Sequence, residues 1–476
     1  DIAKRLAAEI RQHPQDVRLR RQQMRLQRAS IGTVDAFCLH FVQQNFSALD
    51  VPPDFTIADD ATLVRLQQET LSTVLEQAYT DPDFCAFADL YDRGRTDDTT
   101  GRAVQELYHF TQALPHPAQA LQRFVEMWQS DAPPEKTQWG QAVLRETSAR
   151  IKGVLRLLRT AQKMAAKDPA ADKALTAVLM DDEDRMLLVL DRLDHGAWDT
   201  VPEALDNADN WRRAGRVPGG IASNIAAMSA NMLRDRAKKQ IATLKTDFLL
   251  CPAADYQADR RRAAPLVAAL VRAVEQYRRT LLEAKLAEKV LDYADLEHMT
   301  LELLLTPEYE RTSLCRTVSA RYSAVLVDEY QDTNALQDAI YFALAAPDAS
   351  NLFFVGDIKQ SIYRFRQADP SVFVGKQTAW QPYPADAPVP YPEPATIALD
   401  ANFRSAPQVV EGVNFLFERL MSPELGDTAY GDGQRLVCGA PGEYTGSVEA
   451  HFLPDDTAET DAGWIARRIE EMVQSG

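Results

Sequence analysis

Two adjacent carboxylates, Asp328 and Glu329, directly follow the apolar run Val325–Val327 in the stretch "VLVDEYQDTN". Beyond a buried strand, one carboxylate can hold Mg²⁺, usually through the ion's water shell, while a second orients or deprotonates an attacking water. This combination is typical of phosphoryl transfer. Turns and helix N-caps also favour such residues, so the pair taken alone is equally open to a structural interpretation.

A second segment, "VGDIKQSIYRFR" at Val355–Arg366, combines a Gly turn, an amide and alternating aromatic and Arg residues. The Gln360 amide can sense a terminal phosphate or the attacking water. Tyr363 and Phe365 can stack on unpaired bases, an interaction that contributes about 1–3 kcal/mol per base and tolerates any base sequence. The alternative is an amphipathic edge whose aromatic rings belong to the core.

A third segment, "LDANFRS", places Arg404 next to Phe403 after another apolar run. A guanidinium suits the charge that builds on the oxygens of a transferring phosphoryl group, and a planar ring beside it can stack on adenine. Arg followed by Ser at a strand end is otherwise common. The segment gains meaning because it follows the other two.

The elements that position these residues are short apolar runs that end in polar residues: "SAVLVDE", "NLFFVGD" and "ATIALDANFRS". Such runs predict strands buried on both faces of a parallel sheet. Ligands bind beyond the carboxyl ends of the strands in these sheets, so the three polar clusters are expected to converge there. Between the second and third runs lies a proline-rich spacer, to which no chemistry is assigned: Pro382, Pro384, Pro388, Pro390, Pro392 and Pro394.

From about Asp59 to Glu288 the sequence shows helical periodicity instead. Apolar residues recur at spacings of three, four and seven, which predicts amphipathic helices with these residues on the buried face: Val64, Leu71, Val74 and Leu75, then Val267, Leu270, Val271, Val274 and Leu281. Polar or Gly-containing connections are expected at 194–199 and 215–220. The function of this helical region is not evident from its sequence.

Composition bounds the class of protein. The 476 residues, 46% hydrophobic and 25% charged, predict a soluble chain of about three domains, and no apolar run is long enough for a membrane span. With no signal peptide, a cytoplasmic location is expected. Five widely spaced cysteines without a CxxC pair indicate reduced thiols, so neither a zinc nor an iron–sulfur site is predicted within the chain.

The net charge of −17 argues against a polyanionic partner, because nucleic-acid-binding proteins usually present a basic surface. The charge is uneven, however. Residues 1–28 hold eight Lys or Arg against three acids, so this segment carries +5 and the rest of the chain −22. Such a strip can contact phosphates, although a solvated helix face is the alternative interpretation.

The three segments, in this order, resemble motifs II, III and IV of the UvrD/Rep superfamily 1 helicases. "ASIGTVDAFC" at Ala29–Cys38 resembles the family's earlier DNA-contacting T-x-H-x-F motif, with Asp35 where His is usual. A carboxylate repels a phosphodiester, so no direct DNA contact is expected of Asp35. Further stretches are similar to the AddA branch, the helicase–nuclease subunit of bacterial double-strand-break processing: "DFTIADDAT", "LDYADLEHM" and "NLFFVGDIKQSIYRFRQADP".

The resemblance implies a role for each matching residue. Asp328, with Glu329, would hold Mg²⁺, and Glu329 would activate water. Gln360 would couple the nucleotide state to DNA, while Arg404 would contact the γ-phosphate of ATP and Phe403 would lie near adenine. The residues implied at single-stranded DNA are Phe37, Tyr363, Phe365 and Arg366, with Thr33 supporting the DNA-contacting loop.

The implied fold is α/β: a RecA-like parallel-sheet motor domain of the P-loop NTPase fold, here incomplete, with a large all-helical insertion domain. The expected boundaries are 1–55 and 290–408 for the first motor domain, 56–289 for the insertion, and 409–476 for the start of a second motor domain. No G-x-x-x-x-G-K-[ST] loop occurs, because "VGKQT" at Val374–Thr378 lacks the upstream Gly and the final Ser or Thr. One further strand is expected near 447–452 and a helix near 462–473.

We therefore expect an internal fragment of an AddA-type subunit that hydrolyses ATP to translocate 3′ to 5′ on single-stranded DNA, the fragment itself being inactive. The resemblance also implies two kinds of partner, duplex DNA ends and a second, AddB-like subunit. A nuclease with a cysteine-bound iron–sulfur cluster would lie outside this chain. Two alternatives stay open: a stand-alone UvrD/Rep-like repair helicase, and a non-enzymatic scaffold that keeps the motor fold to bind DNA or a partner.

Overall fold

The computed structural model describes residues 2–26, 29–92, 98–195, 198–248, 251–384, 393–422, 428–431, 433–439, 446–451 and 461–475. The chain divides into two compact units, residues 1–373 and 374–476, each treated below by itself. The domain boundaries expected from the sequence stay predictions. Among the described helices, none combines the length and the apolar character needed to cross a membrane.

The first unit opens with two basic helices, α1 (Ile2–Gln12) and α2 (Val17–Leu26), and α2 buries none of its side chains. Arg28, the last residue of the predicted basic strip, lies outside the described residues. Next comes α3 (Val34–Asn45), followed by a short 3₁₀ turn, η1 (Phe46–Ala48). Cys38, Phe41 and Val42 on α3 are buried, so this helix is anchored to a core.

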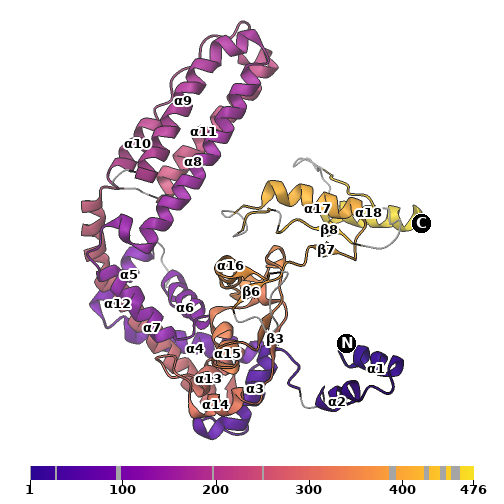
Figure 1. Ribbon diagram of the computed structural model, residues 1–476. Helices are drawn as coiled ribbons and strands as arrows, with labels where there is room; N and C mark the ends of the chain where they lie inside the picture. Colours follow the sequence, from indigo (N-terminus) through magenta and orange to yellow (C-terminus); the bar gives the residue numbers. More distant parts are fainter. Residues whose placement is uncertain are drawn as a thin grey trace. The chain divides into compact units, whose positions relative to one another are not determined.

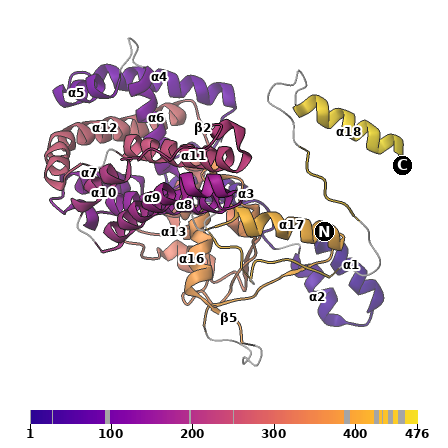
Figure 2. The same ribbon diagram turned by 90° about the horizontal axis from the view of Figure 1, so that it is seen from above.

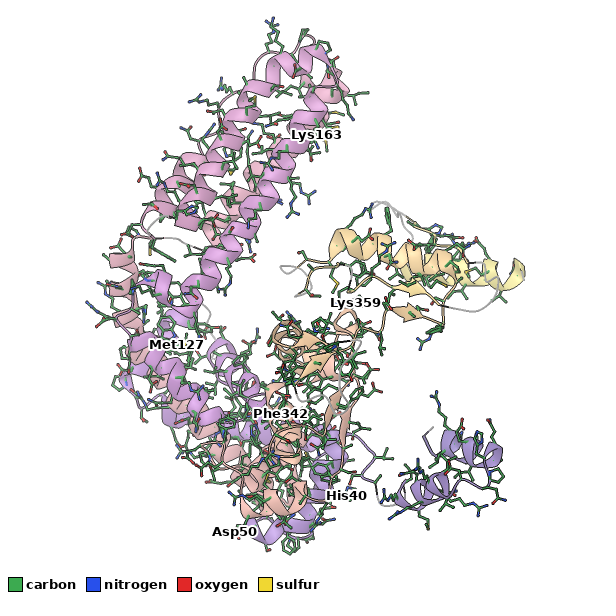
Figure 3. All side chains as sticks on the ribbon, in the orientation of Figure 1. His40, Asp50, Met127, Lys163, Phe342 and Lys359 are labelled. Carbon is green, nitrogen blue, oxygen red and sulfur yellow. The ribbon has the colours of Figure 1, made fainter. Side chains whose placement is uncertain are left out.

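The predicted helical region is confirmed as helical, and its first and last helices are capped at Asp59 and Glu288. One part is a long bundle with a common core, seen at the top of Figure 1, where Figure 3 places Lys163. Its members are α8 (Gln138–Ala165), α9 (Pro169–His195), α10 (Thr200–Ala208) and α11 (Ile225–Phe248), with η3 (Ile221–Ser223) leading into the last. A buried ion pair between Arg234 and Asp182, 2.6 Å from nitrogen to oxygen, joins α11 to α9.

The other part packs four shorter helices against α12 (Ala253–Ala287), as Figures 1 and 2 show. These are α4 (Asp60–Ala78), α5 (Pro82–Tyr91), α6 (Asp98–Gln112) and α7 (Pro117–Gln129), with η2 (Pro134–Lys136) after them. The residues predicted on the buried face of α12 are buried, as is Val74 on α4. Val64 was wrongly predicted, since it is 51% exposed and its neighbour Leu66 takes the core position.

A short parallel pair brackets the helical region. β1 (Thr56–Ile57) lies just before α4 and pairs with β2 (Val290–Leu291), which lies just after α12. The chain therefore leaves and re-enters the same place, and the helical region is attached at one point of the first unit. Behind β2, a third core joins α3 to α13 (Tyr293–Leu304), α14 (Ser313–Ser319) and α15 (Ala335–Leu344).

Two of the predicted strands are present and parallel. β3 (Val325–Val327) pairs with β4 (Leu352–Phe354) in register, and a 3₁₀ turn follows each strand, η4 (Tyr330–Asp332) and η5 (Ile358–Gln360). The expectation that both faces are buried was wrong, because Leu326 is 71% and Phe353 52% exposed. Within the described residues this sheet has two strands, and only the face of Val325 and Val327 is partly covered.

The third predicted strand is not one strand. Its residues form β6 (Ala395–Thr396), which pairs with β5 (Gln381–Pro382), and β7 (Ala401–Asn402), which pairs with β8 (Val437–Cys438). Ile397 and Leu399 between them are 61% and 81% exposed, so apolar character alone did not extend the ladder. The predicted spacer residues Pro388, Pro390 and Pro392 lie outside the described residues.

The remaining helices are η6 (Arg364–Arg366), α16 (Pro370–Ala379), α17 (Pro407–Leu420) and α18 (Asp461–Ser475). The helix predicted near 462–473 is confirmed by α18. The strand predicted near 447–452 is wrong for 447–451, which have no regular structure, and Phe452 lies outside the described residues. The Gly-Lys pair of "VGKQT" lies within α16, so it belongs to a helix instead of a phosphate-cradling loop.

Candidate ATP and single-stranded DNA site

The two carboxylates lie where the sequence predicts them, immediately after β3. Both Asp328 and Glu329 are exposed. Glu329 adopts a left-handed backbone conformation, with φ of 51°, and its N–H donates to Oδ1 of Asp328 at 3.0 Å. A non-Gly residue in this region is uncommon and marks a strained turn. The turn projects both acids beyond the end of the strand.

Tyr330 anchors this turn in the protein. Its ring is 1% exposed and stacks on Phe354 of β4 with centroids 4.1 Å apart. Its hydroxyl donates to Oδ1 of Asp338 on α15, and burial raises the pKa of the Tyr330 phenol above its usual range. The backbone N–H of Tyr330 donates to the carbonyl of Val355 at 2.9 Å, so the turns that follow β3 and β4 are joined.

Gln331, to which the sequence alone assigned no role, sits at the centre of the site. Its side chain is 1% exposed, and Nε2 donates to Oε2 of Glu329 at 2.7 Å. Its Oε1 accepts from the backbone N–H of Asp357 at 3.0 Å. The signal that could have found it was an uncharged amide between three acids in "DEYQD", since an amide can serve a carboxylate and a backbone N–H at once.

Gly356 makes that contact possible. A Cβ at this position would lie 2.7 Å from Oε1 of Gln331 and 3.1 Å from its backbone nitrogen, and the first of these distances is shorter than real Cβ contacts. The Gly turn noted in the sequence is therefore required by close approach of two backbones. No residue larger than Gly fits without moving Gln331.

Gln360 comes from η5, on the same side of the sheet as the carboxylates. Its Nε2 donates to Oδ2 of Asp357 at 3.1 Å, and Lys359 pairs with the other oxygen of that carboxylate at 2.7 Å. Figure 3 shows Lys359 in this loop. Because β3 and β4 are adjacent and parallel, the loop that carries Gln360 stands beside the turn that carries Glu329, as the sequence predicts.

The aromatic residues after Gln360 form an exposed turn. Phe365 is 76% and Tyr363 37% exposed, their ring centroids lie 5.8 Å apart, and the Arg366 guanidinium stands 5.3 Å from one ring and 5.6 Å from the other. The alternative that these rings belong to the core is therefore wrong for Phe365. Two bonds fix the base of the turn: Nε2 of Gln367 donates to the carbonyl of His109 on α6, and the N–H of Asp369 donates to the carbonyl of Thr333 at 3.1 Å.

The residues of the earlier motif belong to α3. Oγ1 of Thr33 caps this helix by accepting from the N–H of Ala36 at 3.2 Å. Phe37 is half-buried and stacks on Phe41 with centroids 5.6 Å apart. Burial raises the pKa of the Asp35 carboxyl. Phe37 also lines a pocket of about 250 Å³ between α3 and α14.

Arg404 and Phe403 belong to the second compact unit, residues 374–476. They follow β7, where Oδ1 of Asn402 accepts from the N–H groups of Arg404 at 3.0 Å and Ser405 at 2.8 Å and so closes a turn. Both side chains are exposed, and Phe403 covers Gly439, where a Cβ would come within 2.7 Å of its ring. Within its unit, Arg404 thus has the exposure that a phosphate contact requires.

The donor set fits Mg²⁺. Among the described residues no group of three or more His, Cys, Asp or Glu is placed to hold a metal ion, so the carboxylates of Asp328 and Glu329 are the ligands available here. Mg²⁺ is commonly bound through one or two carboxylates, several waters and the substrate's phosphates. Two exposed carboxylate groups at a strand end match that requirement.

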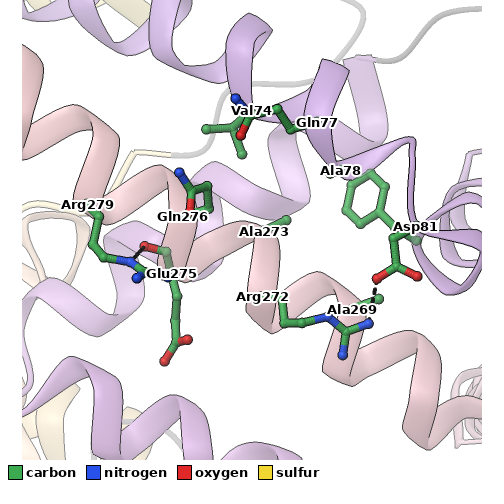
Figure 4. Close-up of a pocket in the computed structure, with 11 residues that line it drawn as sticks. Val74, Gln77, Ala78, Asp81, Ala269, Arg272, Ala273, Glu275, Gln276 and Arg279 are labelled. Carbon is green, nitrogen blue, oxygen red and sulfur yellow. Dashed lines mark hydrogen bonds and ion pairs between the residues drawn. The ribbon is translucent and has the colours of Figure 1, made fainter.

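A pocket of about 310 Å³ lies elsewhere, between α4, α5 and α12 (Figure 4). Arg272 at its rim pairs with Asp81 at 2.6 Å, and Arg279 donates to the carbonyl of Glu275. None of the predicted site residues lines it. We assign it no role in the chemistry of the site.

Comparison with known proteins agrees with this geometry. The UvrD/REP helicase N-terminal domain matches residues 2–381. Proteins named as the A component of an "ATP-dependent helicase/nuclease" from Anoxybacillus flavithermus and Pelotomaculum thermopropionicum are each 31% identical, over 99% and 96% of this chain and 40% and 37% of their own length. A namesake from Staphylococcus aureus is 30% identical over 97% of this chain and 38% of its own length.

The chain thus spans about 40% of the length of the curated relatives that it resembles. The match to the helicase domain covers the α3 motif, the turns after β3 and β4 and the aromatic turn, and it includes the helical region between them. A RecA-like fold follows from that match, and the resemblance found in the sequence is confirmed. The chain belongs to the UvrD/REP helicase family, represented here by the family's N-terminal domain.

Proposed function

We propose that this chain is the motor portion of an AddA-type subunit that hydrolyses ATP to move 3′ to 5′ along single-stranded DNA during double-strand-break processing. One observation carries the proposal. Two exposed carboxylates and the loop of Gln360 share one edge of the β3–β4 sheet, and the same loop continues into an exposed turn of two aromatic rings and an Arg. Phosphoryl-transfer chemistry and a base-stacking platform are therefore within one short stretch of chain.

In this proposal Asp328 and Glu329 provide the oxygen ligands for Mg²⁺, and bound Mg²⁺ would neutralise charge on the phosphate oxygens. Glu329 orients the attacking water and accepts its proton at the carboxylate. Its Oε2 is already occupied by Gln331, and among the described residues Oε1 accepts no hydrogen bond, so Oε1 is the oxygen available for water. Gln360 senses the terminal phosphate from the neighbouring loop.

Arg404 supplies positive charge to the γ-phosphate in this proposal, with Phe403 against adenine. Their exposure and the Asn402 turn that presents them support these roles. Tyr363 and Phe365 stack on bases, and Arg366 adds a cation beside both rings. Thr33 fixes the start of α3 as its cap, and the half-buried ring of Phe37 contributes an aromatic surface for a base.

We further propose that residues 1–55 and 290–408 belong to a first RecA-like domain, 56–289 to a helical insertion, and 409–476 to the start of a second RecA-like domain. The β1–β2 pair at both ends of the helical region supports the insertion. From the names of the relatives we propose helicase and nuclease activity for the whole protein, with duplex DNA ends as a substrate and a partner in the form of a second, AddB-like subunit. An iron–sulfur cluster, if the whole protein carries one, is assigned to none of the residues of this chain.

The test is strand displacement by the full-length protein with its partner subunit. We expect ATP-dependent unwinding of a duplex with a 3′ single-stranded tail, together with ATP hydrolysis that rises when single-stranded DNA is added. A duplex with a 5′ tail is the matched control and should be unwound poorly by this motor. Hydrolysis unaffected by DNA, or unwinding only from the 5′ tail, would contradict the proposal.

A further inference from the structure

Gln331 is the link between the water-orienting carboxylate and the loop that leads to the aromatic turn. Its amide is used at both ends: Nε2 donates to Glu329 at 2.7 Å and Oε1 accepts from the N–H of Asp357 at 3.0 Å. The side chain is 1% exposed, so water cannot readily replace either partner. A shift of the Asp357 backbone must therefore either move the amide or break the bond.

The chemical identity of this residue is dictated by its two partners. A carboxylate needs a donor, a backbone N–H needs an acceptor, and of the side chains of this length only Gln offers both in one planar group. Glu would keep the bond to Asp357 and place a like charge against Glu329. Met would fill a similar volume and make neither bond. Gly356, where a Cβ would lie 2.7 Å from Oε1, keeps the path to this amide clear.

The loop on the far side of Gln331 runs without a break to the aromatic turn. Asp357 accepts from Gln360 and pairs with Lys359, and Oγ of Ser361 contacts the carbonyl of Gln331 at 3.4 Å. Further along, the bond from Asp369 to Thr333 ties the end of the aromatic turn back to the segment that follows Glu329. The segments 329–333 and 355–369 are thus held together on both sides of Tyr363 and Phe365.

We propose that Gln331 is a positioning residue that transmits occupancy of the aromatic turn by single-stranded DNA to the carboxylate of Glu329. Bases that stack on Tyr363 and Phe365 fix the loop at Asp357, the Asp357 N–H fixes the Gln331 amide, and Nε2 then holds Glu329 in the orientation that serves the attacking water. This inference rests on the proposed function. It adds the physical route by which DNA stimulates hydrolysis.

The experiment compares Gln331→Met with Gln337→Met in the full-length protein bound to its partner subunit. Gln337 on α15 is the matched control, because its amide also donates to a carboxylate, Oε1 of Glu297 at 2.8 Å, but does not contact Glu329 or the loop after β4. Steady-state ATP hydrolysis is measured with and without an oligothymidine strand. Binding of a fluorescent oligothymidine and the KM for ATP are measured on the same samples.

For Gln331→Met we expect the DNA-stimulated kcat to fall by about 10-fold or more, as for loss of a hydrogen bond to a charged group. The rate without DNA should fall much less, so the stimulation ratio collapses, while KM and oligothymidine affinity stay within about 3-fold of wild type. Gln337→Met should keep the wild-type ratio. Gln331→Glu, which keeps one bond, is the second variant if Gln331→Met does not fold, and it should also lose stimulation.

Several outcomes overturn the inference. Stimulation retained in a folded Gln331 variant, equal losses with and without DNA, or a loss of stimulation shared by Gln337→Met would each reject it. If the wild-type protein shows DNA-stimulated hydrolysis while a folded Gln331 variant keeps that stimulation, the proposed function stands and only the coupling route fails. If the wild-type protein shows no such hydrolysis, both fail.

Discussion

Glu329 is held on one side only: Gln331 occupies Oε2, and the left-handed turn at its backbone points the carboxylate beyond the end of β3. Such strain persists where the surroundings fix it, and here the buried Tyr330 ring and the Gln331 amide do so. At this scale the site is a rigid base beneath exposed functional groups. Substitutions of the exposed groups should therefore change chemistry or DNA binding and leave the fold intact.

Glu329→Gln in the full-length protein should slow ATP hydrolysis by at least about 100-fold and leave ATP binding nearly unchanged, because it removes the proton acceptor while keeping shape. Phosphate release and binding of a fluorescent ATP analogue measure the two quantities. The control is Glu302→Gln, an exposed glutamate on α13. Equal losses of hydrolysis and ATP affinity would count against water activation by Glu329.

Phe365→Ala should weaken binding of single-stranded DNA by about 1–3 kcal/mol irrespective of base sequence, because stacking on an exposed ring is lost. The 76% exposure of this side chain predicts little change in the melting temperature. Phe415→Ala is the matched control, since Phe415 is 54% exposed and also carries an Arg guanidinium, that of Arg419 at 3.6 Å. A lower melting temperature with unchanged DNA affinity would point to a core role instead.

At the scale of elements, α13 brings ionisable groups into the core that joins it to α3 and α15. Glu297 on α13 is 5% exposed, accepts from Gln337 of α15, and burial raises the pKa of its carboxyl to about 7. Asp35 of α3 adds to this shift, and burial raises its own pKa too. The next residue along α13, His298, has its pKa lowered to about 4, chiefly by burial.

Because its folded pKa of about 7 lies above the unfolded value of 4.5, Glu297 binds more protons in the folded chain. Its contribution is therefore most favourable below about pH 4.5 and is lost as the pH rises through about 7. Glu297→Gln should stabilise the protein at about pH 8, by up to about 3 kcal/mol, and change little at about pH 5. Urea unfolding at both pH values tests this, with Glu302→Gln, exposed on the same helix, expected to show no pH-dependent difference. A stabilisation by Glu297→Gln that is equal at both pH values would show that Glu297 is charged in the folded state throughout.

At the scale of the whole molecule, the helical region is attached at the β1–β2 pair and is tied to the site through α6, whose carbonyl at His109 accepts from Gln367. The carbonyl of Ala113, just beyond α6, accepts from the N–H of Leu336 at the start of α15. The helical region therefore contacts both the aromatic turn and the helix that follows the carboxylates.

The 476 residues by themselves should show no ATP hydrolysis, with or without single-stranded DNA, and no nuclease activity. They contain no G-x-x-x-x-G-K-[ST] loop, so the backbone N–H groups and Lys that normally hold the β and γ phosphates are lacking in this sequence. DNA binding should be weak and strongly salt-dependent, because the basic strip and the aromatic turn supply most of it. Turnover that survives purification and disappears in Glu329→Gln would refute this prediction.

The sequence by itself determined the family, the helical character of 59–288, two parallel strands and the positions of Asp328, Glu329, Gln360, Tyr363 and Phe365 beyond them. These features follow from local periodicity and from motifs whose residues are near one another in the chain. The bridging role of Gln331, the burial of Glu297, the exposure of Leu326 and Phe353, and the pairing of β7 with β8 were decided by the tertiary structure. Each depends on segments that are distant in the sequence, and no local pattern specifies which distant group will cover a side chain or satisfy its hydrogen bonds.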